Sequence, residues 1–233
     1  FNEAVTGNLQ RKDRLVLAHI PVGTTNDVGV MFGYGKDIKK NLSLLLNGVT
    51  KEMDICIING QPFVYVAGFG KFMHIPYQTS RKLKKKWGYM PYLMEGAKDF
   101  FSPTKLYKLS YKVNGIEKTG YYSFMLISNA NRIAGINNFY KDVKLDDDTF
   151  EVLFCNFRKR IDIIRTFTML LTLDVTKVSG LEFYRTNHIE LEFEDYPKKA
   201  WCIDGEKLGR AVLKYDISNV HNFKIMMPKK NID

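Results

Sequence analysis

The segment that could most readily meet a phosphate group is residues 21–27, which read Pro-Val-Gly-Thr-Thr-Asn-Asp. Placed between a strand and a helix, its glycine lets backbone amides and threonine hydroxyls approach phosphate oxygens closely. Asp27 adds a carboxylate that could hold Mg²⁺ directly or through water. The same residue types form ordinary turns and helix caps, so this segment alone favours a structural turn.

Further carboxylates lie at or just before two other expected strands. Asp54 stands at the start of an apolar strand, where aspartate is uncommon. Residues 144–149 read Lys-Leu-Asp-Asp-Asp-Thr and bring three acidic side chains together before another strand. Packed carboxylates repel one another, so a divalent cation or a neighbouring lysine is expected among them. The simpler alternatives are a water-facing edge residue at position 54 and a solvated acidic turn at 146–148.

The last candidate is the acidic turn Asp204-Gly205-Glu206 near the end of the chain. Asp-Gly between two short apolar runs is a common hairpin turn, and taken alone it favours that structural interpretation. In the functional alternative, Glu206 faces a cleft and acts as the general base for a hydroxyl group.

The densest basic run is Arg81–Trp87, and Tyr89 and Tyr92 follow it. Cations beside tryptophan and tyrosine suit the headgroup region of an anionic bilayer. They would equally suit a nucleic-acid backbone with aromatic rings stacked on bases. A solvated helix face with its aromatic side chains in the core is at least as good an interpretation.

The composition narrows the class of protein. The chain has 233 residues, of which 45% are hydrophobic, and this fraction is too high for a disordered or low-complexity chain. Its formal net charge of +10 favours an anionic partner. No apolar run reaches the roughly 18 residues that a membrane-spanning helix needs. Three cysteines without a Cys-x-x-Cys pair predict buried thiols in a reducing compartment, and four histidines without ligand spacing argue against a zinc site. We therefore expect a cytoplasmic protein.

The elements that must position these residues change in character near residue 55. Before it we expect a buried strand over 14–20, a helix capped by Thr25, Asn26 or Asp27, a helix over 38–47 and a strand over 51–58. Asp37 and Gly48 are the expected N-cap and C-terminal stop of the second helix. Alternating strands and helices of this kind indicate an α/β unit.

After residue 55 most segments predict antiparallel strands. The clearest is residues 188–194, where apolar residues alternate with glutamates and one face of the strand should be buried. Helices are expected over 78–100 and 160–174. The predicted fold class is α/β plus mainly-β: a partial α/β domain at 1–54, followed by a larger antiparallel β-sandwich-like domain at 55–227. The chain end at 228–233 is expected to return to the first domain. The other expected strands cover residues 61–68, 106–113, 120–128, 150–156, 199–203, 211–217 and 222–227.

Taken in order, these segments resemble the soluble diacylglycerol kinase catalytic-domain family, which includes bacterial diacylglycerol kinases and sphingosine kinases. Four signatures carry the resemblance: residues 21–27, Asp54, residues 144–147 and residues 204–206. The resemblance implies that residues 1–54 are the remnant of a nucleotide-binding domain and that the β domain takes a lipid substrate.

The start of the chain also resembles part of a family motif. In the family the phosphate loop reads Gly-Gly-Asp-Gly-Thr, any residue, Asn-Glu, and Phe1-Asn2-Glu3 matches only its tail. The resemblance therefore implies an amino-terminally truncated chain, which we expect to be inactive on its own.

The resemblance assigns a role to each candidate residue. Asn2 and Thr24 would meet the phosphates of ATP, and Asp27 and Asp54 would orient Mg²⁺ and its waters. Glu206 would take the proton of the acceptor hydroxyl.

The acidic segment at 144–149 corresponds to a loop that can hold a structural Mg²⁺ in the family. The ligands implied by position are the backbone carbonyls of Lys144 and Thr149 and the carboxylate of Asp147. Asp148 stands where the family usually has glycine, and aspartate adopts a left-handed backbone only at some cost.

The function implied is transfer of the γ-phosphoryl group of ATP, with Mg²⁺, to a lipid hydroxyl, and diacylglycerol is the expected acceptor. Arg81–Trp87 would contact the membrane surface peripherally, no nucleic acid is expected, and a homodimer is left open. One alternative is a kinase that resembles NAD kinases and has a soluble acceptor. The other is a non-catalytic module that binds acidic lipid or nucleic acid.

Overall fold

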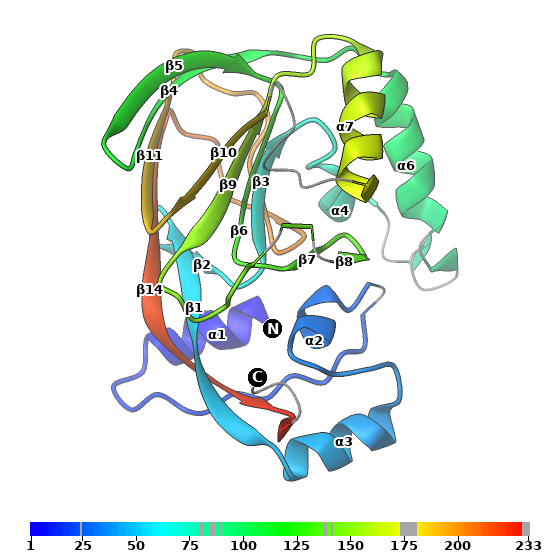
Figure 1. Ribbon diagram of the computed structural model, residues 1–233, viewed down its shortest axis with the longest axis vertical. Helices are drawn as coiled ribbons and strands as arrows, with labels where there is room; N and C mark the ends of the chain where they lie inside the picture. The colour runs from blue at the N-terminus through cyan, green and yellow to red at the C-terminus, as the bar shows by residue number, and fades with distance from the viewer. Residues whose placement is uncertain are drawn as a thin grey trace.

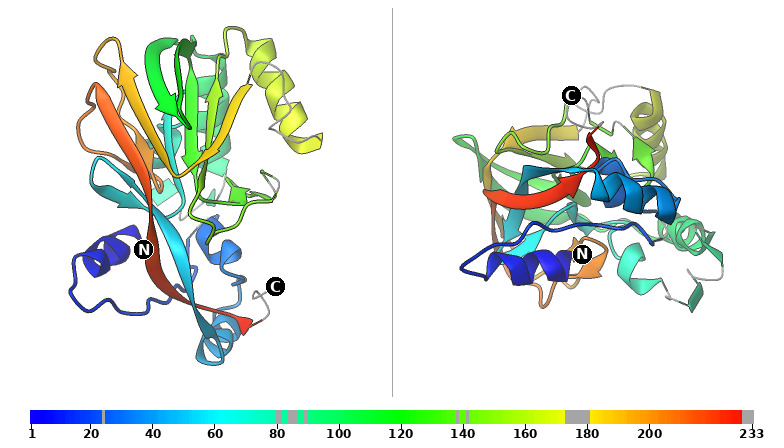
Figure 2. Two further views of the ribbon diagram at one scale, coloured as in Figure 1. Left: turned by 60° about the vertical axis from the view of Figure 1, so that its left-hand side comes forward. Right: turned by 90° about the horizontal axis from the view of Figure 1, so that it is seen from below.

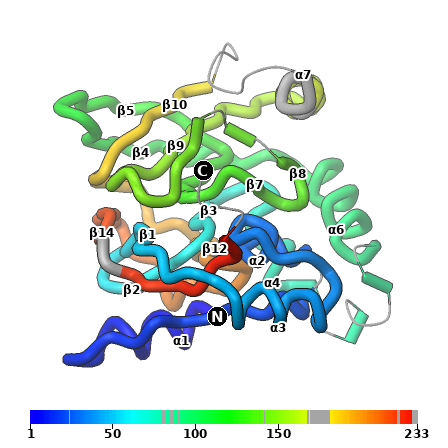
Figure 3. Tube along the Cα trace, turned by 60° about the horizontal axis from the view of Figure 1, so that its bottom comes forward, coloured from blue at the N-terminus to red at the C-terminus, as the bar shows by residue number. Residues whose placement is uncertain are grey.

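The computed structural model describes residues 1–23, 25–79, 82–83, 87–88, 90–137, 139–140, 142–172 and 181–229. Two layers of antiparallel sheet form the upper part of the molecule, and three helices lie at its lower end (Figure 1). These helices are α1 (Asn2–Leu9), α2 (Asp27–Met31) and α3 (Ile38–Leu46). Figure 3, turned to bring the lower end forward, shows them gathered there.

Each layer of the upper part is a six-stranded antiparallel sheet. In spatial order, the first contains β2 (Gln61–Phe63), β1 (Val49–Ile58), β14 (Lys214–Met227), β11 (His188–Phe193), β4 (Tyr107–Val113) and β5 (Ile116–Tyr122). The second contains β10 (Leu181–Thr186), β9 (Phe150–Cys155), β6 (Phe124–Ser128), β3 (Val66–Gly70), β12 (Cys202–Ile203) and β13 (Glu206–Lys207). The expected antiparallel β-sandwich-like architecture is confirmed.

Apolar side chains from the facing surfaces of both sheets fill the space between them, around Trp201, Phe69 and Tyr111. The strand with the clearest sequence pattern, β11, buries Ile189, Leu191 and Phe193 and exposes the residues between them, as its alternation predicts. All three cysteines are free and buried, as expected.

The strands β1 and β14 connect the two ends of the molecule. They pair from Val49 opposite Met227 to Ile58 opposite Ile217, and Figure 2 shows them as one twisted ribbon that runs from the helices into the sandwich. The register of this pairing shifts between Met53 and Asp54. The proposed domain boundary at residue 54 therefore falls inside a continuous strand, at its irregularity.

The sequence signals around α3 fit the structure. Asp37 is its N-cap, and its side chain accepts a hydrogen bond of 3.1 Å from the backbone N–H of Lys40. Gly48 follows the C-cap Asn47 at the start of β1. A Cβ atom at Gly48 would lie 2.6 Å from the carbonyl oxygen of Met227, so glycine is needed there for close approach of β14.

Several expected elements differ from the structure. Residues 14–20 do not form a buried strand: Leu15, Val16 and Ile20 are exposed, and the segment contacts β14 only through a single parallel bridge between Leu17 and Ile225. One bridge on one side provides too few neighbours to bury an apolar run. The expected strands at 211–217 and 222–227 merge into the single strand β14.

The expected helix over 78–100 is also different: among the described residues it is not one continuous helix, because α4 is followed by an extended residue. Helix α4 (Ile75–Gln78) has a proline in its first turn and ends at Thr79, whose backbone is extended. Helix α6 (Met90–Phe101) begins eleven residues later. Residues 80, 81, 84–86 and 89 lie outside the described residues, and so does most of the basic run Arg81–Trp87.

The remaining elements are the helix α7 (Arg160–Thr172) and the hairpin of β7 (Arg132–Ile133) and β8 (Ile136–Asn137). The expected end of α7 at 173–174 lies outside the described residues. In the described part of the chain, no helix is both long and apolar enough to cross a membrane.

Candidate functional site

The turn Asp204-Gly205 forms the hairpin between β12 and β13 that the sequence predicts. Asp204 has φ +47° and Gly205 has φ +87°, the two left-handed conformations of a tight hairpin turn. The Asp204 side chain is also a structural anchor. It accepts hydrogen bonds from the backbone N–H groups of Val64, Tyr65 and Val66, at 2.8, 2.9 and 3.1 Å.

A fourth hydrogen bond to Asp204 comes from the first helix of the chain. Asn2 Nδ2 donates to Asp204 Oδ2 at 2.6 Å and to the carbonyl oxygen of Pro62 at 3.0 Å. Burial raises the pKa of Asp204, and these hydrogen bonds lower it in opposition. The start of α1, the β2–β3 connection and the turn before Glu206 are therefore held together by one carboxylate.

Glu206 is exposed and borders two cavities. The larger cavity, of about 670 Å³, extends from Glu206 to the start of α1 and is also lined by Asn2, His19 and Tyr65. The smaller cavity, of about 450 Å³, is lined by the α4 side chains Pro76 and Tyr77, by Thr79 and by Tyr92 of α6. Both cavities are of a size that suits small ligands or part of a larger one.

Asp27 lies at the beginning of α2, where Asn26 is the N-cap with a left-handed backbone and without a side-chain cap bond. The carboxylate is buried, and its Oδ1 accepts hydrogen bonds from Arg132 Nε at 2.8 Å and from the backbone N–H of Gly135 at 3.0 Å. The β7–β8 hairpin therefore covers one oxygen of Asp27 and balances its charge.

Tyr65 links the surroundings of Asp27 to those of Asp204. Its backbone N–H donates to Asp204, and its hydroxyl accepts a hydrogen bond of 2.8 Å from the backbone N–H of Ala134. Burial raises the pKa of the Tyr65 hydroxyl, and the negative charge of Asp27 raises it further. The hydroxyl therefore stays protonated.

Asp54 belongs to a second group, together with the acidic segment. Its backbone N–H donates to the carbonyl oxygen of Leu145 at 2.9 Å, and its Oδ2 accepts from the backbone N–H of Asp148 at 2.8 Å. Because Asp54 follows the register shift of β1, its N–H is directed to this loop. The buried Asp54 carboxylate thus fixes the acidic loop against β1.

The acidic loop offers the hard oxygen donors that Mg²⁺ and Ca²⁺ prefer. Asp147 Oδ1 accepts hydrogen bonds from Thr149 Oγ1 at 2.7 Å and from the backbone N–H of Thr149 at 3.2 Å. Asp148 has φ +59°, so this loop keeps the left-handed conformation although it lacks glycine there. Lys144 is exposed at the beginning of the loop.

The structure therefore places the sequence-predicted residues in two groups. Asn2 and Glu206 border the larger cavity, and Asp27 interacts with Tyr65, which also lines it. Asp54 lies with Lys144, Asp147 and Thr149. Thr24 lies outside the described residues.

Sequence reasoning missed Arg132 and Tyr65 and treated Asp204 only as a turn residue. No local signal identifies Arg132, because its partner Asp27 is 105 residues away. The Asp-Gly sequence predicts the turn conformation of the Asp204 backbone. It does not predict the four hydrogen-bond donors around the Asp204 carboxylate.

The chain was compared with known proteins. The family model described as diacylglycerol kinase catalytic domain matches residues 1–58. The chain is 26% identical over 235 residues to the diacylglycerol kinase of Bacillus subtilis (strain 168). The aligned region covers 100% of this chain and 76% of that protein. It is 25% identical over 229 residues to the diacylglycerol kinase of Staphylococcus epidermidis (strain RP62A), and this region covers 98% of this chain and 71% of that protein. Among solved structures, a diacylglycerol kinase from Bacillus anthracis str. Sterne matches with a TM-score of 0.75 at 20% identity, over 98% of this chain and 74% of that one. That likeness supports the fold alone.

Proposed function

Because the comparisons confirm that this chain resembles the bacterial diacylglycerol kinases, we propose that it is an ATP-dependent lipid kinase. The reaction is transfer of the γ-phosphoryl group of ATP to a lipid hydroxyl, and diacylglycerol is the proposed acceptor. The observation that carries this proposal is the network of Asp204, which links Asn2 to the turn that presents Glu206 at the edge of both cavities.

In this proposal, the two parts of the chain bind different substrates. Residues 1–54 contribute to the ATP side, with Asn2 near its phosphates. Residues 55–227 contribute to the lipid side. The larger cavity reaches from one part to the other, since it is lined by Phe1 and Asn2 as well as by Ile203 and Glu206.

Glu206 is the proposed general base. Phosphoryl transfer depends mainly on positioning and charge neutralisation, because its transition state is loose. The acceptor hydroxyl becomes acidic as its oxygen bonds to phosphorus, and a carboxylate held at the right place can then take its proton. The anchored Asp204 supports this role, because it fixes the turn that precedes Glu206.

Asp27 and Asp54 are the proposed residues for orienting Mg²⁺ and its waters on the ATP side. A structural Mg²⁺ would be held by Asp147 and the carbonyl oxygens of Lys144 and Thr149, a set of hard oxygen donors that fits this ion. When bound beside ATP, Mg²⁺ supplies positive charge that neutralises the phosphate oxygens.

The test is an assay of the full-length gene product for phosphate transfer from labelled ATP, with Mg²⁺. The acceptors are diacylglycerol, monoacylglycerol, ceramide and sphingosine in mixed micelles, and NAD in solution. Transfer to diacylglycerol that is lost in Glu206→Gln is the expected result. Glu192→Gln is the matched control, because Glu192 is an exposed glutamate of β11, ion-paired with Lys214 and away from both cavities. Transfer that survives in Glu206→Gln would reject Glu206 as the base. Transfer only to a water-soluble hydroxyl compound, such as NAD, would reject the lipid kinase.

A further inference from the structure

The two cavities share a small part of their lining. Among the described residues, only Asp204, Glu206 and Lys207 line both of them. All three belong to the β12–β13 hairpin, so this hairpin is the ridge where the cavities meet. In the proposed function the larger cavity reaches the ATP side, and the acceptor hydroxyl meets Glu206. The group that is transferred must therefore pass beside this ridge.

Lys207 is the one of these three residues that has no role so far. The Asp204 carboxylate is occupied by four hydrogen-bond donors, and Glu206 is the proposed base. The Lys207 side chain is exposed, and no carboxylate in the described part of the chain forms an ion pair with it. By contrast, Lys214 of β14 pairs with Glu192 at 3.2 Å. The Lys207 ammonium is therefore available to an anionic ligand.

The other charged side chains that line the cavities are acidic. Glu3 lines the larger cavity, and Asp204 and Glu206 line both. Burial lowers the pKa of His19, which also lines the larger cavity, so its imidazole is neutral at pH 7. Lys207 is the only lysine or arginine among the described residues that line either cavity. A triphosphate near these carboxylates is repelled, and Lys207 is the described side chain whose charge opposes that repulsion.

The hairpin fixes the backbone of Lys207. Lys207 lies opposite Cys202 in the pairing of β12 with β13, and the next backbone N–H, that of Leu208, donates to the carbonyl oxygen of Trp201 at 2.9 Å. Trp201 and Cys202 are buried. A side chain on paired backbone with a buried neighbour is positioned better than one on an open loop. The flexible stem of lysine then lets the ammonium reach a ligand at the ridge.

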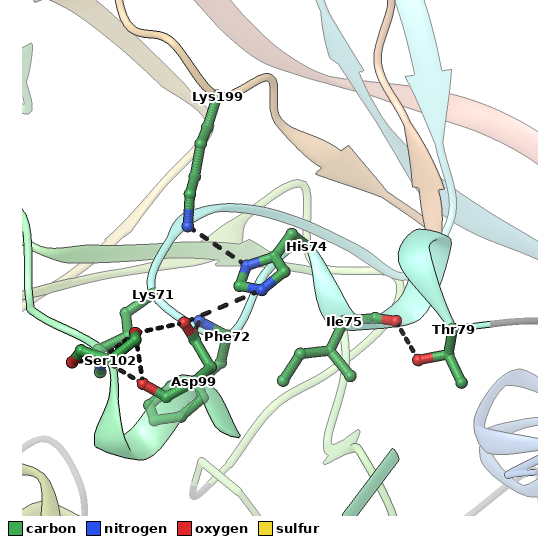
Figure 4. A network of polar contacts seen from close by, with 8 residues as sticks. All are labelled: Lys71, Phe72, His74, Ile75, Thr79, Asp99, Ser102 and Lys199. Carbon is green, nitrogen blue, oxygen red and sulfur yellow. Dashed lines mark hydrogen bonds and ion pairs between the residues drawn. The ribbon is translucent and has the colours of Figure 1, made fainter. Parts of the chain in front are cut away.

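Helices α4 and α6, which also line the smaller cavity, are held by a polar network (Figure 4). The Asp99 carboxylate of α6 accepts hydrogen bonds from the backbone N–H of Phe72 at 2.6 Å and from Ser102 Oγ at 2.9 Å. The buried Lys71 Nζ donates to the carbonyl oxygens of Asp99, at 2.6 Å, and of Ser102, at 3.1 Å. Because a buried charge costs free energy unless it is paired, this network around α6 fixes the helix against the end of β3.

The same network includes the start of α4. His74, the N-cap of α4, lies 3.9 Å from Asp99 and 3.4 Å from Lys199 Nζ. At the other end of α4, Thr79 Oγ1 donates to the carbonyl oxygen of Ile75 at 2.6 Å. The nearby cations Lys71 and Lys199 are thus engaged in the network, and neither lines either of the two cavities. They do not replace Lys207 at the ridge.

We propose that Lys207 is a further catalytic residue, whose ammonium contacts the oxygens of the transferring phosphoryl group. In the step, the acceptor oxygen forms a bond to the γ-phosphorus, and the bond from that phosphorus to its bridging oxygen breaks, so that ADP leaves with the electron pair. The proton of the acceptor hydroxyl goes to Glu206, and Lys207 keeps its own protons. A cation that touches the outer phosphoryl oxygens lowers the barrier because negative charge is spread over them. This inference rests on the proposed function and adds a residue to its site.

The first test measures kinetics of the full-length gene product with ATP, Mg²⁺ and diacylglycerol in mixed micelles. In Lys207→Met, kcat should fall at least about tenfold, while KM for ATP and for diacylglycerol should change less than about threefold. Lys207→Arg keeps the charge and should retain at least about a third of the wild-type kcat. The matched control is Lys214→Met, because Lys214 is an exposed lysine that lines neither cavity, and its kcat should equal that of wild type.

The second test does not depend on turnover. ADP with aluminium fluoride and Mg²⁺ resembles the transferring phosphoryl group, so calorimetry should show that Lys207→Met binds this complex at least about tenfold more weakly than wild type. Binding of ADP with Mg²⁺ alone should change less than about threefold. Circular dichroism and thermal unfolding would establish that the variants are folded, and the substitutions replace exposed side chains.

Four outcomes decide the proposal. Equal kcat and equal binding of ADP with aluminium fluoride in wild type and Lys207→Met would overturn it and leave the lipid kinase intact. A raised KM for diacylglycerol with unchanged kcat would also overturn it, because Lys207 would then bind the acceptor. Equal losses in Lys207→Arg and Lys207→Met would reject the charge as the cause. Weaker binding of ADP with aluminium fluoride in Lys207→Met, in a protein that transfers phosphate to no lipid, would keep the phosphoryl contact and reject the lipid kinase.

Discussion

Asn2 and Asp204, 202 residues apart in the sequence, are joined by a hydrogen bond of 2.6 Å between Nδ2 and Oδ2. The bond links the first helix of the chain to the hairpin turn that carries Glu206. The proposed ATP side and the proposed base of the site therefore share one anchor. A change in the position of α1 would be transmitted to Glu206 through this carboxylate.

Removing the Asp204 carboxylate should be costly. In Asp204→Ala the N–H groups of three backbone residues and the Asn2 amide lose their acceptor, and a buried donor left unpaired costs about 1–3 kcal/mol. We expect the free energy of unfolding to fall by about 3–5 kcal/mol, measured by urea denaturation. Asn2→Ala removes a single donor and should cost about 1–2 kcal/mol. Equal losses in both variants would show that the backbone donors find other partners.

The ion pair of the buried Asp27 with the partly buried Arg132 gives a second prediction. Arg132→Ala removes the positive charge that balances the buried Asp27 carboxylate, and breaking a buried ion pair from one side costs about 3–5 kcal/mol. The exposed pair of Lys98 and Glu95 is the control, since Lys98→Ala should cost only about 0.5 kcal/mol. Similar unfolding free energies for the two variants, from denaturant titration, would mean that the Asp27 carboxylate is solvated.

The sequence patterns predicted those features whose cause is local. The alternation in β11, the Asp37 cap of α3 and the Asp-Gly hairpin all depend on residues within a few positions of one another. The β-sandwich-like architecture followed from the number of such strands. The prediction of a buried strand at residues 14–20 was wrong because its cause is not local. The apolar run has the pattern of a buried strand, but its burial depends on neighbouring elements that only the tertiary structure reveals.

The candidate site shows the same division. The family resemblance pointed to Asp27, Asp54 and Glu206, whereas each local motif alone favoured a structural interpretation. The partners of the two buried carboxylates come from distant segments. Arg132 reaches Asp27 from the β7–β8 hairpin, and the acidic loop reaches Asp54 because the register of β1 shifts. A helix over 78–100 was expected, whereas the inward direction of Asp99 in α6 depends on Lys71 and Phe72, which follow β3.

The acidic loop allows a test of backbone strain. Asp148 has φ +59°, a conformation that a residue with a Cβ atom adopts at a cost of roughly 1 kcal/mol and that glycine adopts freely. Asp148→Gly keeps the backbone N–H that donates to Asp54, so it should raise the free energy of unfolding by about 0.5–1 kcal/mol. Asp148→Ala should lower it by a similar amount. If thermal and urea denaturation give the opposite order, the Asp148 side chain contributes more than its backbone conformation costs.

The network around α6 should make stability depend on pH through His74. Burial lowers the pKa of His74 below 6.5, Lys199 and Lys71 lower it further, and Asp99 and Glu95 raise it in opposition. Since the folded pKa lies below the unfolded one, the unfolded chain binds the proton more tightly as the pH falls below 6.5. The free energy of unfolding should therefore decrease from pH 7.5 to pH 5, and it should decrease less in His74→Gln. Burial also lowers the pKa of His19. The variant His19→Gln is therefore the control that measures how much of the pH dependence comes from His19 and not from His74. Urea denaturation at pH 7.5 and at pH 5 measures this decrease for each protein. An equal decrease in wild type and His74→Gln would mean that His74 is protonated as easily in the folded protein as in the unfolded chain.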